Sequence, residues 1–371
     1  MGKTLRDYLQ PQPKSKVKAG QGMEVGMYKF FTSSAVQSKY LDEYSYDEPA
    51  LIFGTGGSAS VHYCDEPFST STDCIVTYAK DFVDLKLLYY YLSGNIVLLQ
   101  NGFKGAGLQH ISKDYILDIP FEMPSKDLVR DIVSSFDYIT DLSNMIKRQN
   151  ELFDKMVKSR FVGMFGELRL NSMAWDEYPL GLICDKVVRY PTFYGMEYLP
   201  SGTRVIRIGN ILPDGHMELD DENYVFVYDT VNEDFPETVI ELNDIIMAVR
   251  GDGSAAKRIG IVTEPNLIDA NISPNLIRIK VNNAMLNPIY MFYYLTGEVG
   301  QKRLDAYVNK TAKKNIAAKD IVKIVTPVPP LPLQNDFAAF VREIDKSKLA
   351  VKESLEKLEI LKKALMQQYF G

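Results

Sequence analysis

A segment from the middle of the chain recurs at its end, and this repeat constrains the fold more than any other feature. Shifting the 371-residue sequence by 205 residues places residues 111–166 on residues 316–371 without a gap. A chain built this way is expected to have two similar halves, which suit a bipartite target better than a single catalytic pocket. Identical residues meet throughout the overlap, including Ile116 and Ile321, Ile119 and Ile324, Pro124 and Pro329, Asp131 and Asp336, Ile139 and Ile344, and Phe165–Gly166 and Phe370–Gly371.

Both copies of the repeat carry the pattern of a long amphipathic helix. Residues 127–162 contain no proline, and their apolar residues recur at steps of three, four or seven, the spacing of one helix face. Neither apolar face is stable in water, so we expect the two helices to pack together as an antiparallel coiled coil. The apolar positions are Ile132, Phe136, Ile139, Ile146, Phe153 and Val157 in the first copy, and Phe337, Val341, Ile344, Val351, Leu355, Leu358 and Leu365 in the second.

The segments outside the repeat have the composition of strands and turns. Runs rich in β-branched and aromatic residues, such as 50–53, 224–228 and 275–281, alternate with turn signals, and tyrosine-rich short helices are expected at 85–94 and 287–297. We therefore predict an α+β fold with two strand-rich domains and two long helices. The expected order is a first domain (1–123), a helical spacer (124–166), a second domain (167–329) and a second spacer (330–371), related by pseudo-two-fold symmetry.

Composition excludes several classes of protein. No apolar run approaches the roughly 18 residues of a membrane span, and the N-terminus lacks a secretory signal, so we expect a cytoplasmic location. Three cysteines without a close pair and three scattered histidines predict neither a disulfide framework nor a metal site. The net charge of −6 excludes a uniformly basic surface, but local basic loops remain compatible with nucleic-acid binding.

Two glycine-containing segments are candidates for contact with phosphate groups. Gly54–Ser60 and Arg250–Ala256 each contain Gly-Ser-Ala before a tyrosine-rich helix, and small residues allow close approach of backbone N–H donors to phosphate oxygens. A plain tight turn is the alternative interpretation. Basic residues gather in loops of both domains, where they would neutralise phosphates, although a solvated charged rim has the same composition. The candidate residues are Lys16, Lys18, Gly56, Gly57, Ser58, Lys104, Arg204, Arg207, Asn210, Arg250, Gly253, Ser254, Lys257, Lys313 and Lys314.

Catalytic motifs are weak. Asn287-Pro288-Ile289-Tyr290 is similar to the Asn-Pro-Pro-Tyr motif of amino-methyltransferases, but its third residue differs and it precedes a helix rather than following a strand. A helix N-terminus with proline in its first turn explains the same residues. No hydrolase or transferase constellation is present, so we expect no active site.

The order of domain, helix, domain and helix resembles the specificity subunits of bacterial type I restriction-modification systems. The resemblance includes Pro329-Pro330-Leu331-Pro332-Leu333-Gln334 before the second helix and the Phe-Gly pairs that close both helices. Met123-Pro124-Ser125-Lys126, before the first helix, departs from that pattern. Residues 26–34 and 54–60 are similar to one class of target recognition domain, which adds further candidate DNA contacts at Tyr28, Thr32, Ser33 and Ser34.

The resemblance implies a non-catalytic DNA-binding subunit. Each target recognition domain would read one half of an interrupted double-stranded DNA site, and the helices would set the half-site spacing and dock two methyltransferase subunits. Restriction subunits would join for cleavage. The chain itself would need no cofactor, since S-adenosylmethionine, Mg and ATP would be used only by partner subunits. Two alternatives stay open, a coiled-coil scaffold that never binds DNA and a stand-alone adenine methyltransferase.

Overall fold

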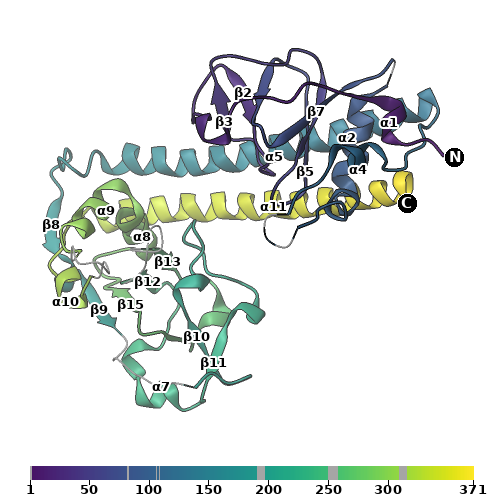
Figure 1. Cartoon of the computed structure of the whole chain (residues 1–371). Helices are drawn as coiled ribbons and strands as arrows, with labels where there is room; N and C mark the ends of the chain where they lie inside the picture. The colour runs from purple at the N-terminus through teal and green to yellow at the C-terminus, as the bar shows by residue number, and fades with distance from the viewer. Residues whose placement is uncertain are drawn as a thin grey trace. The chain divides into compact units, whose positions relative to one another are not determined.

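The chain folds into two compact units. The computed structural model describes residues 2–81, 83–105, 107, 109–189, 197–249, 258–308 and 316–371 (Figure 1). Unit 1 comprises Met1–Gln149 and Val351–Gly371, and unit 2 comprises Asn150–Ala350. The long helices α5 (Lys126–Phe165) and α11 (Leu331–Phe370) each contribute to both units. The predicted α+β fold, with two strand-rich domains and two long helices, is confirmed.

Unit 1 arranges its strands in two sheets. The larger sheet has the order β1-β7-β4-β5 with antiparallel neighbours, and the smaller has the order β3-β2-β6 with β2 parallel to β6. The central strand β4 is buried along its whole length, which explains its continuous apolar sequence. The strands are β1 (Leu9–Pro11), β2 (Tyr28–Phe31), β3 (Lys39–Leu41), β4 (Ala50–Gly54), β5 (Ser60–Cys64), β6 (Phe68–Thr70) and β7 (Cys74–Ala79). The short helices are α1 (Leu5–Tyr8), η1 (Ala19–Gln21), α2 (Leu85–Gly94), α3 (Val97–Gln100) and α4 (Lys113–Leu117).

Unit 2 repeats this topology and adds an antiparallel two-stranded sheet of β8 and β16. Its larger sheet has the order β13-β12-β15-β9, and its smaller sheet has the order β11-β10-β14 with β10 parallel to β14. The strands are β8 (Asp176–Pro179), β9 (Cys184–Arg189), β10 (Thr203–Ile206), β11 (Val225–Val227), β12 (Ile245–Ala248), β13 (Ile259–Ile261), β14 (Asn271–Ile272), β15 (Leu276–Val281) and β16 (Val325–Val328). The short helices are α6 (Leu180–Ile183), η2 (Ile208–Asn210), η3 (Asp221–Asn223), α7 (Val231–Asp234), η4 (Pro236–Thr238), η6 (Pro265–Leu267), α8 (Pro288–Thr296), α9 (Glu298–Asp305) and α10 (Ala318–Ile321).

The duplication therefore extends from the helices to the strand-rich domains. Taken from its other edge, the larger sheet of unit 2 has the order β9-β15-β12-β13, and the larger sheet of unit 1 has the order β1-β7-β4-β5. Strands at the same place in the two orders also follow one another in the same order along the chain, so the two sheets are equivalent. The smaller sheets match in the same way, including the single parallel pair in each. Loops of different length separate the equivalent strands, which is why no single shift of the sequence aligns them.

The tyrosine-rich helices begin with equivalent caps. The side chain of Asp84 accepts a hydrogen bond from the backbone N–H of Lys86 at the start of α2. Asn287 accepts the equivalent bond from Ile289 at the start of α8, where Pro288 occupies the first turn. The segment Asn287–Tyr290 is thus a helix N-terminus, and the structure favours this interpretation over a methyltransferase motif.

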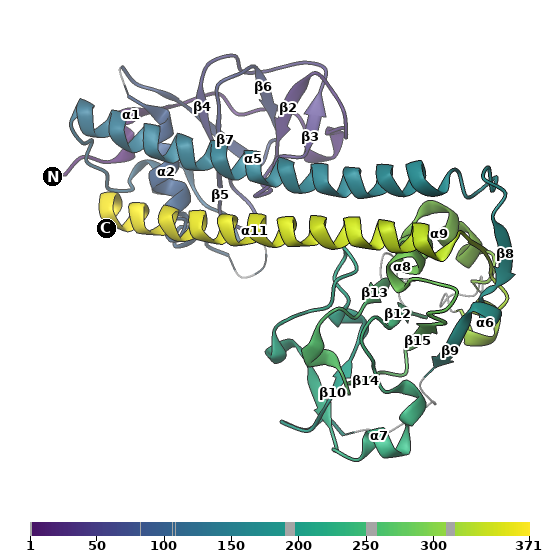
Figure 2. The same ribbon diagram turned by 180° about the vertical axis from the view of Figure 1, so that it is seen from behind.

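Antiparallel contacts between α5 and α11 occur within each unit (Figure 2). In unit 1, the ring of Phe136 near the start of α5 stacks on Phe370 at the end of α11, with ring centroids 6.1 Å apart. In unit 2, Phe161 contacts Phe337 at 5.3 Å, and Asp154 pairs with Lys348 at 2.5 Å. The predicted antiparallel packing is confirmed, and the first helix extends slightly beyond the predicted residues 127–162.

The repeated Phe-Gly pairs place aromatic rings in the two cores. Phe165 is fully buried, 4.7 Å from the ring of Tyr290 in α8. Phe370 lies 5.4 Å from the ring of Tyr91 in α2. Each helix therefore ends on the tyrosine-rich helix of a strand-rich domain, and aromatic pairs of this kind add to the stability gained from burial.

The two helix entries differ at one buried position. The fully buried side chain of Gln334 accepts a hydrogen bond from the backbone of Asn287 at 2.8 Å, and it donates to the carbonyls of Met285 and Pro329 at 3.1 and 2.6 Å. At the 205-residue shift, the first helix has Val129, which packs on the apolar core of unit 1. The two junctions are therefore held by different chemistry, hydrogen bonds in unit 2 and apolar packing in unit 1.

Candidate nucleic-acid interface

Three connections of unit 1 meet at the backbone carbonyl of Asp73, which lies between β6 and β7. This oxygen accepts hydrogen bonds from the Oγ of Ser33 at 2.6 Å, from the Oγ1 of Thr55 at 2.9 Å and from the backbone N–H of Thr55 at 2.9 Å. Ser33 follows β2 and Thr55 follows β4. The structure therefore joins the candidate residues after β2 to the glycine-containing segment after β4.

The glycines of this segment have different structural roles. A side chain at Gly54 would lie 2.3 Å from the Oγ of Ser60 and 2.9 Å from the Cα of Ser33, so the close approach requires glycine. Gly57 adopts a φ of +80°, and a side chain added there would meet nothing within 4 Å, as expected for an open turn. The backbone N–H of Gly56 donates to the Oγ of Ser33 at 3.3 Å. Gly57 and Ser58 are therefore exposed at the tip, while Gly54 and Gly56 are packed against the loop after β2.

Two histidines that the sequence did not single out hold the same loops. His62 on β5 is hydrogen-bonded through Nε2 to the carbonyl of Ser34 at 2.9 Å, and burial lowers the pKa of its imidazole. A neutral imidazole must donate in this bond because the carbonyl can only accept. His110 is bonded through Nδ1 to the carbonyl of Thr55 at 3.1 Å and pairs through its backbone with Lys104. In the sequence, His110 is notable only because it directly precedes the repeat that begins at residue 111.

Exposed lysines surround the joined loops. The backbone of Lys104 is hydrogen-bonded to the backbone of His110. The backbone N–H of Thr72 donates to the carbonyl of Val17 at 2.8 Å, and this bond places Lys16 and Lys18 next to the segment that ends at Asp73. All three lysines are exposed. They give this part of unit 1 a local positive charge in a chain whose net charge is −6.

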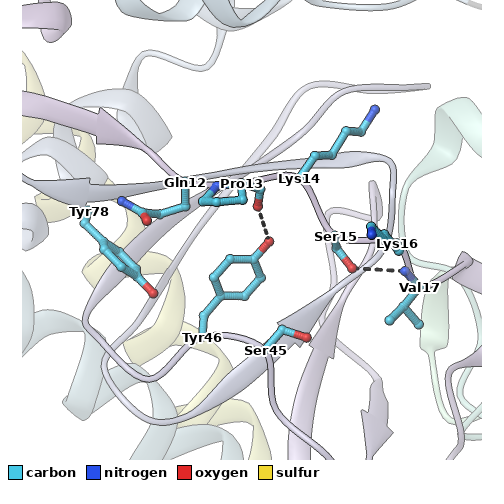
Figure 3. Close-up of a pocket in the computed structure, with 9 residues that line it drawn as sticks. All are labelled: Gln12, Pro13, Lys14, Ser15, Lys16, Val17, Ser45, Tyr46 and Tyr78. Carbon is cyan, nitrogen blue, oxygen red and sulfur yellow. Dashed lines mark hydrogen bonds between the residues drawn. The ribbon is translucent and has the colours of Figure 1, made fainter.

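An open pocket of about 420 Å³ adjoins the Lys16 segment (Figure 3). On one side, the hydroxyl of Tyr46 donates to the carbonyl of Pro13 at 2.8 Å, which fixes the path of the chain. Lys14 extends away from the pocket in Figure 3. The lining residues are Gln12, Pro13, Lys14, Ser15, Lys16, Val17, Ser45, Tyr46 and Tyr78.

Tyr28 lies apart from the loops that are joined at the Asp73 carbonyl. It begins β2, while Thr32 follows the last residue of that strand. Its ring contacts Tyr44 at 5.1 Å, and its neighbour Met27 is 75% exposed. The strand thus separates Tyr28 from Thr32, Ser33 and Ser34.

The candidate side chains at the end of β10 are largely used inside unit 2. Arg204 pairs with Asp221 at 2.7 Å and lies over the ring of Tyr224 at 5.4 Å. Arg207 donates to the carbonyl of Asn223 at 3.2 Å. Both arginines therefore brace the segment before β11.

Asn210 is a structural residue in this fold. Its side chain is 2% exposed, accepts a bond from the N–H of Arg207 at 2.8 Å and donates to the carbonyl of Asn223 at 2.9 Å. Asn210 lies beyond β10, which ends at Ile206, and its bond with Arg207 closes a turn. With its amide buried and bonded, Asn210 shapes the loop instead of presenting a group to a ligand.

Unit 2 repeats the backbone bonds that support the glycine segment of unit 1. The N–H of Val249 donates to the carbonyl of Asn275 at 3.0 Å, as that of Thr55 does to Asp73. The N–H of Ile316 donates to the carbonyl of Val249 at 3.1 Å, as that of Ile111 does to Thr55 at 3.2 Å. Val249 is the last described residue before the second glycine segment. The candidates Arg250, Gly253, Ser254, Lys257, Lys313 and Lys314 lie outside the described residues.

Other classes of site find little support in the described part of the chain. No cluster of three or more His, Cys, Asp or Glu side chains there is arranged to hold a metal ion. None of the helices in the described ranges combines the length and apolar character that a membrane crossing requires. What remains is a set of exposed loops supported by a duplicated scaffold.

Comparison with known proteins agrees with this scaffold. Residues 5–152 match the family model of the type I restriction modification DNA specificity domain. The type I restriction enzyme EcoBI specificity subunit of Escherichia coli is 21% identical over 339 residues, covering 84% of this chain and 69% of that protein.

Solved structures share the fold. The crystal structure of a type I restriction-modification system S subunit from M. genitalium matches with a TM-score of 0.62 and 17% identity, covering 100% of this chain and 96% of that one. A chain from a study of complex assembly and conformational transition of the type I R-M system matches with a TM-score of 0.50 and 13% identity, covering 99% and 96%.

The fold holds two topologically equivalent strand-rich domains, and the segment that includes the first of them matches a DNA specificity domain. The whole chain is similar in sequence and fold to specificity subunits of type I restriction-modification systems.

Proposed function

We propose that each strand-rich domain reads one half of an interrupted double-stranded DNA site. The observation that carries this proposal is the repeated support of the glycine segments, since Thr55 and Val249 make equivalent backbone bonds in two domains of the same strand order. Equivalent scaffolds with different loop sequences suit two half-sites of different sequence. Duplex DNA presents its sequence at base edges in the grooves, which exposed loops can reach.

In unit 1, the proposed contacts divide by chemistry. Lys16, Lys18 and Lys104 would bind phosphates, because an ammonium group neutralises a phosphate without reading sequence. The remaining candidates of unit 1 would meet the groove, with Ser33 and Gly56 holding the loops in place. Those residues are Tyr28, Thr32, Ser34, Gly57 and Ser58.

In unit 2, the division is different. Arg204, Arg207 and Asn210 would shape the segment between β10 and β11, since the Nη2 atoms of the two arginines and the amide of Asn210 donate to Asp221 and Asn223 of that segment. The contacts to DNA would come from the second glycine segment and the basic residues that follow α9. These are Arg250, Gly253, Ser254, Lys257, Lys313 and Lys314, which are proposed on their sequence alone.

The helices would connect the reading domains and dock the enzyme subunits. A 40-residue helix rises about 60 Å at roughly 1.5 Å per residue, more than the roughly 34 Å of one duplex turn. Two exposed apolar residues seven apart on α5, Tyr138 and Met145, are 69% and 61% exposed and offer a helix face to a partner. We retain the four-part division 1–123, 124–166, 167–329 and 330–371 as the working description of reading domains and spacers.

The chemistry would reside in partner subunits. Two methyltransferase subunits would use S-adenosylmethionine, and restriction subunits would use Mg and ATP, while this chain would contribute recognition in the cytoplasm. No membrane partner is included in the proposal.

The decisive experiment is methylation mapping with the reconstituted complex. The full chain is combined with its cognate methyltransferase, incubated with plasmid DNA, and the methylated adenines are located by sequencing. The expected result is one discrete sequence made of two short half-sites separated by an unread spacer. Methylation at unrelated positions, or none despite a stable complex, would contradict the proposal.

Two control measurements separate the alternative functions. A stand-alone methyltransferase would bind S-adenosylmethionine as the purified chain, and we expect no such binding. A scaffold would assemble with its partners but tolerate charge reversal of Lys313 and Lys314 to glutamate, whereas a specificity subunit loses DNA affinity.

A further inference from the structure

A short turn of unit 1 carries the carbonyl at which three connections meet. The turn, residues 71–73, joins β6 to β7. The backbone N–H of Ser71 donates to the carbonyl of Phe31 at 2.8 Å, and the N–H of Cys74 donates to the carbonyl of Ser71 at 3.2 Å. The carbonyl of Asp73 accepts further bonds from the loops after β2 and β4. The backbone of Asp73 is therefore held in place at the centre of the joined loops.

Unit 2 repeats this turn between β14 and β15. The N–H of Ser273 donates to the carbonyl of Ile206 at 2.9 Å, and the N–H of Leu276 donates to the carbonyl of Ser273 at 3.0 Å. The carbonyl of Asn275 accepts a bond from the backbone N–H that directly follows β12. Each of these bonds has a counterpart in the turn of unit 1, so Asn275 occupies the place that Asp73 has there.

The side chains of Asp73 and Asn275 are exposed and have no partner in the described part of the chain. Neither side chain makes a hydrogen bond or an ion pair there, although the backbone of each turn is bonded on both sides. A polar side chain that is free on a fixed backbone suits contact with a base edge, because little ordering remains to be done on binding. Asn210 differs in this respect, since its amide is buried and bonded.

The carboxylate of Asp73 lies among loops with exposed lysines, on a surface that we propose binds DNA. Phosphates repel a carboxylate, and a carboxylate only accepts hydrogen bonds, so it gains from contact with DNA only where a base offers a donor. The donors of the major groove are the N4 amino group of cytosine and the N6 amino group of adenine. Adenine also has the acceptor N7 beside its amino group, which opposes a carboxylate. Cytosine therefore suits Asp73 better.

We propose that Asp73 and Asn275 are specificity-determining residues, each of which reads one base pair in the major groove. This inference rests on the proposed function of the two domains. Asp73 accepts a hydrogen bond from N4 of a cytosine in the half-site that unit 1 reads. Asn275 pairs with N6 and N7 of an adenine in the half-site that unit 2 reads, because an amide has both an acceptor and a donor. One position of the shared scaffold thus carries a different reading group in each domain.

Exchange of the two side chains tests this assignment. Asp73→Asn gives unit 1 the side chain of unit 2, and Asn275→Asp makes the opposite change. The full chain with either substitution is combined with its cognate methyltransferase, and the methylated sequences are mapped by sequencing. We expect Asp73→Asn to change one C·G pair of its half-site to A·T, and Asn275→Asp to change one A·T pair of the other half-site to C·G. Each variant should also lose about tenfold or more in affinity for the original duplex.

Folding measurements separate base reading from support of the turn. Asp73→Ala removes the carboxylate without supplying an amide, and it should abolish discrimination at the same base pair. Because the side chain has no partner in the described fold, Asp73→Ala and Asp73→Asn should unfold at the urea concentration of the wild type. A lowered midpoint would show that the side chain supports the turn, and it would overturn the assignment.

Two matched controls make the same chemical changes at other exposed residues. Asp47 lies before β4, at the opposite end of that strand from the joined loops, and Asn266 lies before β14. Asp47→Asn and Asn266→Asp should leave the sequence of both half-sites unchanged.

The outcomes also distinguish this inference from the proposed function. A wild-type complex with a bipartite sequence that neither exchange alters rejects the reading roles and keeps the function. A change of affinity that is equal for all duplexes shows that Asp73 acts only through its charge, and it rejects the reading role as well. A wild-type complex without a bipartite sequence rejects the proposed function and this inference with it.

Discussion

The hydroxyl of Ser33 donates a hydrogen bond to the carbonyl of Asp73 at 2.6 Å, and the Oγ of Ser33 accepts one from the N–H of Gly56 at 3.3 Å. One small side chain therefore links the connections after β2, β4 and β6. Loops that read DNA must be held near their productive position before binding, because ordering them afterwards reduces affinity. Ser33 is accordingly the residue through which the proposed interface of unit 1 is organised.

Replacing Ser33 with alanine should weaken recognition of one half-site. The substitution removes two hydrogen bonds worth roughly 0.5–1.5 kcal/mol each, so we expect about a two- to tenfold loss of affinity for the first half-site. Affinity is measured by titrating the reconstituted complex with duplexes in which either half-site is altered. Ser38→Ala, in the same loop but outside this set of bonds, is the control. Equal behaviour of the two variants would contradict the role of Ser33.

Reversing the charge of Lys104 should reduce affinity without changing the sequence that is read. A phosphate contact contributes about one unit to the slope of log affinity against log salt, so Lys104→Glu should lower the magnitude of that slope by about one or more. Lys113→Glu makes the same change at an exposed position of α4. A changed recognition sequence, or an unchanged slope, would show that Lys104 does not bind phosphate.

The buried side chain of Gln334 should contribute substantially to the free energy of unfolding of unit 2. Gln334→Leu leaves the N–H of Asn287 and the carbonyls of Met285 and Pro329 without their partner in a buried site. We expect a loss of roughly 2–4 kcal/mol, observed as a lower midpoint of urea unfolding.

Asn335→Ala provides the matched comparison for Gln334. It removes an exposed hydrogen bond with the side chain of Asn287, and its effect should stay below about 1 kcal/mol. If both variants unfold at the same urea concentration, the buried bonds of Gln334 do not hold the junction.

Acid should destabilise unit 2 through Glu241. Bonds with Lys280 and then Arg278 lower the pKa of this carboxyl to about 2, from an ordinary value of 4.5. A lowered pKa stabilises the fold above the ordinary value, and the effect is lost as the pH falls from about 4.5 to about 2. Glu241→Gln should therefore be less stable than wild type at pH 7 and approach it below pH 3. Thermal melts across this range provide the measurement, and a constant difference would exclude the ion pairs as its cause.

The candidate site was predictable only in part. Residue types and glycine spacing indicated Gly56, Gly57 and Lys104, and the family resemblance added Ser33. The structure brings these residues into one set of joined loops. The same reasoning selected Asn210, which is buried, because a polar residue type does not reveal whether its amide is already bonded. His62 and His110 escaped notice since each contacts a loop that is distant in sequence.

The sequence by itself determined the long helices and their pairing. An apolar face repeated over many turns must be covered, and a gap-free repeat of that face supplies the partner. Phe136 and Phe337 were expected on this face, and they contact Phe370 and Phe161 of the other helix. Local periodicity suffices for such elements because neighbours on a helix face are close in sequence.

Only the tertiary structure decided that the two strand-rich domains share one topology. Their strands are short, their loops differ in length, and pairs such as β1 with β7 or β9 with β15 join residues far apart in the chain. Strand order follows from long-range burial and hydrogen bonding, which leave no fixed spacing in the sequence. The position of Ser33 beside Asp73 depends on that order, so the organisation of the loops emerged with the fold.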